Sequence, residues 1–209
     1  MINRILFTRH GETEDNLINR LSTSPPGPSL TELGRDQAKN LKKDLEDIEV
    51  SVIYTSPLVR AIQTAEILRG EKQIDIFEEN ELRELSVGAY EGRNDPDVFK
   101  ELDKVWRKWT VEGELDTTMG IGGESAKQIL VRSQLVINRI LKKNISGTAL
   151  VVAHSGILQL LVSYLCTNLP NSFGVKNWIR NCQLIDTKVQ GQSLECISWG
   201  DIKVFDQPN

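Results

Sequence analysis

The chain has 209 residues, of which 39% are hydrophobic and 26% are charged, and its formal net charge at pH 7 is −4. This composition fits one soluble globular domain, and its mild acidity argues against nucleic acid or a membrane surface as a partner, because both attract basic proteins. The longest apolar runs are too short to cross a bilayer and no signal-peptide pattern opens the chain, so we expect a cytoplasmic protein.

Strand-like and helical segments alternate along the chain, which is typical of βαβ units and a mainly parallel sheet. The expected strands are residues 4–8, 50–55, 74–77 and 148–153, followed by an antiparallel hairpin of 184–189 and 193–199 at a sheet edge. The expected helices are residues 31–47, 56–70, 97–111, 124–143 and 157–166. We expect a single domain over residues 1–209, with the irregular segment at about 86–123 as an insertion.

Two helix starts are predicted from capping residues. Thr31 is the expected N-cap of the first long helix, and Ser56 with Pro57 is expected to provide the N-cap and first residue of the next. The apolar residues of the first long helix recur at helical spacing: Leu33, Ala38, Leu41 and Leu45.

Cysteines and histidines are few. The three cysteines are an odd number without CxxC spacing, which argues against a disulfide framework or a zinc site. The two histidines have no neighbouring cysteine cluster, so the chain supplies a metal centre poorly.

Each histidine nevertheless stands where an apolar strand runs into a glycine-containing turn. His10 lies in ILFTRHGET (residues 5–13), and His154 lies in ALVVAHSGI (residues 149–157). Ligands of open α/β sheets bind at the carboxyl ends of strands, so the recurrence of histidine there indicates a functional site. Two core or surface histidines are the alternative.

The neighbours of His10 suit a phosphoryl group. An imidazole nitrogen can attack phosphorus, and Gly11 lets the backbone turn sharply beside it. Arg9 is adjacent, and its planar guanidinium can bond two phosphoryl oxygens. Arg60, in the first turn of a helix, is a second candidate, although a surface salt bridge is an alternative reading.

Further donors and an acid are needed in the same cleft. Asn16 could donate an amide hydrogen to the anion, and His154 could add a donor, or a charge if protonated. The general acid is sought in ELRELSVGAYEG (residues 81–92). By composition alone this is a charged loop in which no single glutamate stands out.

Together these segments resemble the histidine phosphatase superfamily, which includes cofactor-dependent phosphoglycerate mutases, fructose-2,6-bisphosphatase and alpha-ribazole phosphatase. The matching segments, in the family's order, are TRHGET (8–13), LTELG (30–34), SPLVRAIQTA (56–65), LREL (82–85), GGES (122–125) and VVAHSG (151–156). A lone RHG motif would be weak evidence, whereas six ordered segments are strong.

The resemblance implies a phosphoglycerate mutase-like fold, an α/β/α sandwich of three layers with a mainly parallel central sheet. It implies that His10 becomes a phosphohistidine, with Arg9, Arg60 and His154 around the phosphate. Glu84 is then the proton donor to the leaving oxygen. No metal or organic cofactor is implied, because the guanidiniums and imidazole supply the positive charge.

Three further substrate contacts are expected. Asn16 resembles an auxiliary phosphate ligand of the family. The loop at residues 21–31 departs from the family pattern and holds three prolines, and its Thr23 or Ser24 could reach the phosphate. Ser155 stands where a glycine is common in the family, and it adds a hydroxyl near the pocket.

The expected activity is that of a metal-independent phosphomonoesterase, a hydrolase acting on a small phosphorylated metabolite through phosphohistidine. Mutases of the family usually have longer chains with an extended insertion, so a phosphatase is favoured over a phosphoglycerate mutase. A non-catalytic relative that binds a phospho-ligand or a protein is the alternative of another class, and the complete catalytic set argues against it. The insertion at about 86–123 is expected to cover the active site.

Specificity is expected from the same insertion. Its Arg93, Lys100 and Lys108 could bind a second anionic group, although such side chains are more often merely solvated. Trp106 and Trp109 could form a protein-contact face, but packing on the core or roofing of the cleft is favoured. The C-terminal hairpin offers an edge at which a homodimer could pair.

Overall fold

The computed structural model describes residues 1–143 and 145–204. Its centre is a seven-stranded sheet in the order β3-β2-β4-β1-β5-β6-β7. The parallel strands are β1 (Ile2–Arg9), β2 (Val50–Thr55), β3 (Ile76–Glu78) and β4 (Gly147–Ala153). The antiparallel strands are β5 (Leu184–Gln190), β6 (Ser193–Trp199) and β7 (Ile202–Lys203).

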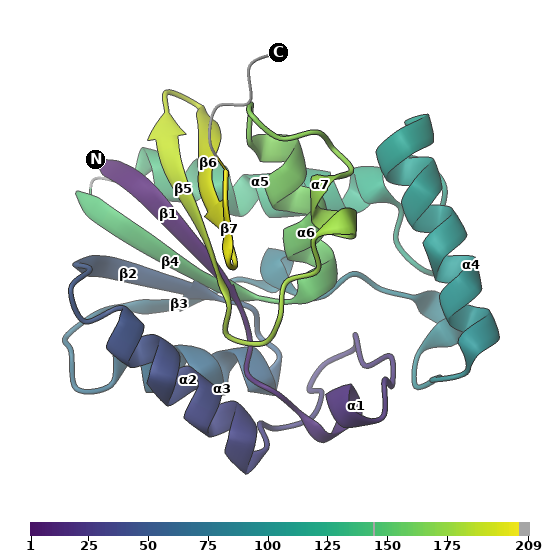
Figure 1. Cartoon of the computed structure of the whole chain (residues 1–209), viewed down its shortest axis with the longest axis horizontal. Coiled ribbons are helices and arrows are strands. Elements are labelled where there is room, and N and C mark those ends of the chain that lie inside the picture. Colours follow the sequence, from purple (N-terminus) through teal and green to yellow (C-terminus); the bar gives the residue numbers. More distant parts are fainter. Residues whose placement is uncertain (144, 205–209) are drawn as a thin grey trace.

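Helices cover both faces of this sheet (Figure 1). On one face lie α2 (Glu32–Asp44) and α3 (Val59–Arg69), and on the other lie α5 (Ala126–Lys142) and α6 (Ser155–Leu165). The shorter helices are α1 (Glu14–Leu17), α4 (Pro96–Arg107) and α7 (Phe173–Lys176). Two 3-10 turns, Asn80–Leu82 and Gly88–Tyr90, and a π-helical turn, Lys108–Glu112, complete the elements.

Alternating side chains of the central strands form two hydrophobic cores. Ile5 and Phe7 of β1 face the core under α5 and α6, whereas Leu6 faces the core under α2 and α3. A strand buried on both faces needs a continuous apolar run, which β1 and β4 have. The predicted three-layer α/β/α sandwich with a mainly parallel sheet is confirmed.

Leu33, one of the four apolar residues at helical spacing, is 55% exposed, because the buried side of α2 follows Gly34, Ala38 and Leu41. One local prediction is wrong. Helix α3 begins at Val59, because the backbone N–H of Ser56 still donates to Val152 in β4, so Ser56, directly after β2, bonds across the sheet rather than capping a helix.

The C-terminal hairpin is present, and it lies beside the parallel strands. Strand β5 pairs with β1, and the two-residue strand β7 pairs with β6 and forms the edge of the sheet. No helix of the described residues, 1–143 and 145–204, is long and apolar enough to cross a membrane.

The aromatic pair of the irregular segment packs inward. Trp109 is fully buried and its indole N–H donates to the carbonyl of Thr117 at 2.8 Å. Trp106 meets it edge-on, with ring centroids 5.2 Å apart. These contacts favour packing on the core over an exposed protein-contact face.

Candidate active site

The candidate site lies at the carboxyl ends of neighbouring strands. Strands β1 and β4 are parallel and Arg9 pairs with Ala153, so the residues that follow, His10 and His154, come together. Their ring centroids are 5.1 Å apart. Ser56, which follows β2 on the other side of β4, lies at the same edge.

His10 is held in one tautomer. Its Nε2 accepts a hydrogen bond from Nε of Arg60 at 2.9 Å, so Nδ1 carries the hydrogen and donates to the carbonyl of Gly11 at 2.7 Å. Gly11 is required there, because a Cβ atom would lie 2.3 Å from the carbonyl oxygen of Gly34 in α2. The unprotonated nitrogen is therefore Nε2, directed at Arg60.

Both histidines are neutral at neutral pH. Burial, together with the positive charges of Arg60 and Arg9, holds the pKa of His10 well below its usual value of 6.5. Burial and the same arginines lower the pKa of His154 in the same way. A neutral imidazole is the nucleophilic form, so His10 keeps its lone pair at pH 7. His154 offers a hydrogen-bond donor rather than a charge.

Two buried arginines flank His10. Arg60 donates from one terminal nitrogen to the carbonyl of Ser22 at 2.9 Å, and its other terminal nitrogen, NH1, is buried without a partner among the described residues. Arg9 donates to the carbonyl of Ile179 at 3.3 Å, and its Nε is likewise buried without a described partner. Neither forms an ion pair within the described chain, so the salt-bridge reading of Arg60 is wrong.

Burial also lowers the pKa of Arg60, to about 10. It remains a cation at neutral pH. Unpartnered buried donors are costly unless an anion or water completes them, so this pair of guanidiniums suits an anion site.

The proline-rich loop holds Arg60. The carbonyl of Ser22 accepts from the guanidinium, and the carbonyl of Pro26 accepts from the backbone of Val59. Gly27 lies so close that a Cβ atom would be 2.5 Å from NH1 of Arg60. The loop is thus a wall of the site.

Glu84 is fixed by backbone donors at the start of α6. Its carboxylate accepts hydrogen bonds from the N–H groups of Gly156 at 3.0 Å, Ile157 at 2.9 Å and Leu85 at 2.9 Å. Gly156 gives it room, since a Cβ atom would lie 2.8 Å from a carboxylate oxygen. The carboxyl group therefore has a defined position facing the cavity.

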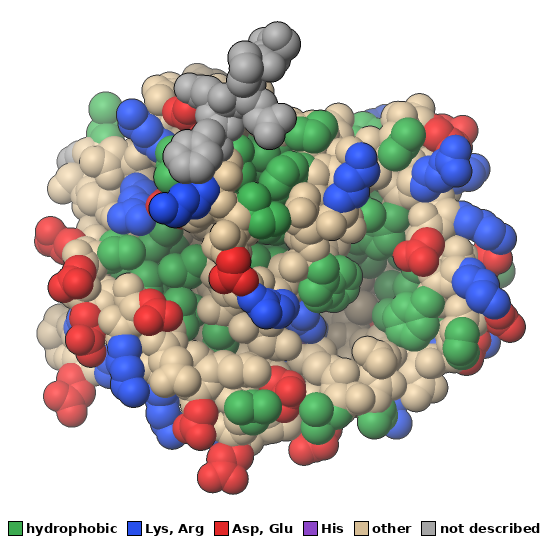
Figure 2. Space-filling view, viewed as in Figure 1, with side chains coloured by type: hydrophobic (Ala, Val, Ile, Leu, Met, Phe, Trp, Pro, Cys, Tyr) green, Lys and Arg blue, Asp and Glu red, His purple; other side chains and the backbone are tan. Residues whose placement is uncertain are grey.

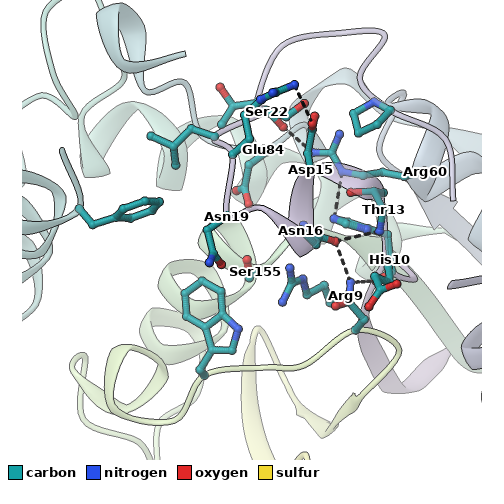
Figure 3. A pocket seen from close by; sticks show the side chains of 18 residues that line it. Arg9, His10, Thr13, Asp15, Asn16, Asn19, Ser22, Arg60, Glu84 and Ser155 are labelled. Carbon is teal, nitrogen blue, oxygen red and sulfur yellow. Dashed lines mark hydrogen bonds and ion pairs between the residues drawn. The ribbon is translucent and has the colours of Figure 1, made fainter. Parts of the chain in front are cut away.

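A cavity of about 380 Å³ unites most of the predicted residues. Figure 2 shows this face of the molecule, hollowed between the part formed by α4 and the rest of the domain. Figure 3 shows the labelled lining residues around the hollow. The predicted residues among them are Arg9, His10, Asn16, Thr23, Arg60, Glu84 and Ser155. His154 is fully buried beside His10 and is not part of the lining.

Thr23 and Asn16, two predicted substrate contacts, also form hydrogen bonds within the protein. The hydroxyl of Thr23 donates to Glu91 at 2.5 Å, so Thr23 ties the proline-rich loop to the segment after β3. Asn16 accepts through its side-chain oxygen from the backbone of Thr13 and from Asn181. Its amide nitrogen has no partner among the described residues, and Asn16 lines the cavity.

The segment between α7 and β5 contributes contacts that the sequence did not reveal. The Asn181 side chain donates to the carbonyl of His10 at 2.8 Å, and the backbone N–H of Cys182 donates to Arg9. Trp178 stacks on the guanidinium of Arg9, 5.6 Å from its ring centroid. No motif marks these residues; the pairing of β5 with β1 brings them to the site.

The described residues contain no group of three or more His, Cys, Asp or Glu side chains placed to hold a metal ion. Phe99, in α4 and within the predicted insertion at about 86–123, lines the cavity. That this insertion covers the site remains a prediction.

The model of the histidine phosphatase superfamily, branch 1, matches residues 5–202. The chain therefore belongs to the histidine phosphatase superfamily, as its ordered motifs indicated. A protein of Photorhabdus laumondii subsp. laumondii named "Probable phosphoglycerate mutase GpmB" is 30% identical over 210 residues, which cover 98% of this chain and 96% of that protein.

Solved structures share the fold over nearly the whole chain. Bacillus stearothermophilus YhfR aligns with a TM-score of 0.79 at 28% identity, covering 97% of this chain and 98% of that one. The alpha-ribazole phosphatase from Shigella flexneri aligns with a TM-score of 0.75 at 25% identity, covering 98% and 96%. The similar proteins thus include both phosphatase and mutase names.

Proposed function

We propose that this chain is a metal-independent phosphomonoesterase that hydrolyses a small phosphorylated metabolite through a phosphohistidine at His10. The observation that carries the proposal is the buried, neutral imidazole of His10, whose Nε2 faces Arg60 while Arg60 and Arg9 keep donors without partners. A nucleophile and fixed positive charge at one point are what phosphoryl transfer requires.

The proposed reaction has two steps, transfer of the phosphoryl group to His10 and hydrolysis of the phosphohistidine. The Nε2 lone pair of His10 attacks phosphorus, the bond from phosphorus to the ester oxygen breaks, and Glu84 gives its proton to that oxygen. Arg9 and Arg60 bind the equatorial phosphoryl oxygens. Water then attacks phosphorus of the phosphohistidine, the bond from phosphorus to Nε2 breaks, and the water proton goes to the Glu84 carboxylate, which releases phosphate and neutral His10.

The charges around the cavity support hydrolysis over a phosphoglycerate mutase. A phosphoglycerate carries a carboxylate that needs a cation beyond the phosphate pocket. The remaining lining cation, Arg20, is paired with Asp15 at 3.4 Å. The candidates for a second anion site, Lys100 and Lys108, are paired with Asp97 and Glu114 outside the lining.

Arg93 is likewise paired outside the lining, with Asp95 at 2.8 Å. The cavity wall beyond the phosphate pocket instead includes the apolar side chains of Leu21, Phe99 and Trp178. We therefore propose a substrate whose leaving group carries no second anionic group.

A mutase is the second candidate, favoured by the name of the relative at 30% identity. Both activities begin with the same phosphohistidine, and they differ in whether water or a second substrate accepts the phosphoryl group. Product analysis separates them.

The test is a metal-free assay of the purified protein on p-nitrophenyl phosphate, with 3-phosphoglycerate plus a trace of 2,3-bisphosphoglycerate in parallel. We expect release of nitrophenol and phosphate, little isomerisation, and no turnover by His10→Ala. Rapid isomerisation with little hydrolysis would establish the mutase. Inactivity in both assays would favour a non-catalytic binding protein.

Chelation and vanadate test the chemistry of the same site. Vanadate forms five-coordinate oxyanions that mimic the phosphoryl transition state, so it should inhibit strongly, whereas EDTA should leave the rate unchanged. Activity that EDTA abolishes and an added metal restores would contradict the metal-independent mechanism.

A further inference from the structure

Ser56 contacts the second histidine at the base of the site. It is fully buried, and its Oγ lies 2.7 Å from Nε2 of His154. Its backbone N–H donates to Val152 in β4, which fixes Ser56 beside the strand that carries His154. None of the proposed catalytic steps uses this hydroxyl.

The donors and acceptors at this contact bear on which ring nitrogen of His154 carries the hydrogen. The Ser56 hydroxyl has one hydrogen, and its oxygen already accepts from the backbone N–H of Leu58 at 3.3 Å. Its other described partner is Nε2 of His154. If the hydroxyl donates there, Nε2 is unprotonated, and the hydrogen of the neutral ring is on Nδ1.

The opposite tautomer leaves more groups unsatisfied. With the hydrogen on Nε2, the Ser56 hydroxyl would have no described acceptor, and the Nδ1 lone pair of His154 would stay buried without a donor. With the hydrogen on Nδ1, only that N–H is without a described partner. Each unpaired buried polar group costs about 1–3 kcal/mol, so the second arrangement is favoured.

We propose that Ser56 is a positioning residue that fixes His154 as its Nδ1–H tautomer, so that this hydrogen bonds the phosphoryl group carried by His10. The role for the phosphoryl group rests on the proposed function, whereas the tautomer does not. The two rings are then complementary. The Gly11 carbonyl keeps the hydrogen of His10 on Nδ1, so its lone pair is on Nε2, where it accepts from Arg60. Ser56 leaves His154 with an N–H on Nδ1 that has no partner among the described residues.

The tautomer can be measured directly, because the chain contains only two histidines. Nitrogen-15 labelling of histidine, with long-range proton–nitrogen correlation at pH 7, distinguishes a protonated from an unprotonated ring nitrogen. His10→Ala assigns the remaining signals to His154. We expect a protonated Nδ1 and an unprotonated Nε2 in the wild type, and a shift of the hydrogen towards Nε2 in Ser56→Ala.

Vanadate binding tests the consequence for the anion. Ser56→Ala should weaken vanadate inhibition about tenfold or more, the effect of losing one well-aligned hydrogen bond to a charged group. Ser56→Thr, which keeps a hydroxyl, should recover most of that loss. The matched control is Thr187→Val, because Thr187 is also fully buried and donates to a backbone carbonyl in β1, remote from His154.

The outcomes separate this inference from the proposed function. A wild-type His154 protonated on Nε2 overturns the inference, even if the protein is an active phosphatase. An unchanged tautomer in a folded Ser56→Ala also overturns it. If Ser56→Ala does not fold, the wild-type spectrum alone decides, and a phosphatase assay without turnover bears only on the proposed function.

Discussion

At the scale of the residue, Arg60 uses its three guanidinium nitrogens differently. Nε donates to His10, one terminal nitrogen donates to Ser22, and the other has no described partner. In the proposed reaction, a bound phosphoryl group would accept from the terminal nitrogen that has no described partner. We propose that Arg60 both holds His10 and binds the substrate.

Replacing Arg60 by lysine should lower kcat/KM on p-nitrophenyl phosphate by about 10²–10³-fold, because a single ammonium cannot keep these contacts. Arg20→Lys is the control, since Arg20 lines the same cavity but is half exposed and paired with Asp15. We expect it to change the rate less than threefold, on the order of a surface ion pair. Equal losses in the two variants would contradict this role of Arg60.

The proposed role of Glu84 as proton donor leads to a specific prediction. Glu84→Gln removes the transferable proton, so it should slow hydrolysis of an alkyl phosphate by about 10²–10⁴-fold. Nitrophenolate leaves without protonation, so p-nitrophenyl phosphate should be much less affected. The measurement is kcat/KM for both substrates with each protein. Equal slowing for the two leaving groups would remove Glu84 from the role of proton donor.

At the scale of the elements, two glycines join helices to the site in different ways. Gly11 packs against the backbone of Gly34 in α2, which cannot move without moving the helix. Gly156, in the first turn of α6, faces the side-chain ends of Leu85 and Glu84, which can move. Alanine at position 11 should therefore lower stability, whereas alanine at position 156 should lower activity.

Gly11→Ala should lower the free energy of unfolding by about 1–3 kcal/mol, as overpacking against fixed backbone does. Gly156→Ala should remain stable but lose activity, because the new methyl group displaces the Glu84 carboxyl. Chemical denaturation and kcat/KM of both variants provide the measurements. A stable Gly11→Ala, or a fully active Gly156→Ala, would contradict these packing arguments.

The elements that carry the motifs were predictable from the sequence because their patterns are local. The apolar runs before His10 and His154 predict two buried parallel strands, and their common direction brings both histidines to one sheet edge. The family resemblance supplied the expected role of Glu84, which composition alone could not single out. The start of α3 was mispredicted because Ser56 bonds across the sheet instead of capping.

The contacts of residues 178–182 could not be predicted from local pattern. Asn181 and Trp178 reach the site only because β5 pairs antiparallel with β1, about 180 residues apart in the chain (Leu6 with Asp186, for example). Hydrophobic periodicity does not report such pairing. Likewise, the ion pairs of Lys100 and Lys108 with Asp97 and Glu114 depend on side-chain geometry.

At the scale of the whole molecule, the site is a concentration of buried polar groups that the rest of the fold must stabilise. Both histidines and both arginines at the site are buried, beside the two hydrophobic cores. A bound oxyanion would complete their unpartnered donors. Anion binding should therefore stabilise the folded state, and a thermal shift with vanadate would be lost in Arg60→Lys.

The same burial makes stability depend on pH. The folded-state pKa values of His10 and His154 lie well below 6.5, so between those values and 6.5 the unfolded chain binds more protons than the folded one. Stability is therefore lost as pH falls through 6.5, by about 1 kcal/mol per histidine between pH 7 and 5.5. Urea denaturation at both pH values measures the loss, and His10→Asn, which removes one of the two groups, should reduce it by about 1 kcal/mol. An equal loss in wild type and variant would mean that His10 is protonated as readily in the folded protein as in the unfolded chain.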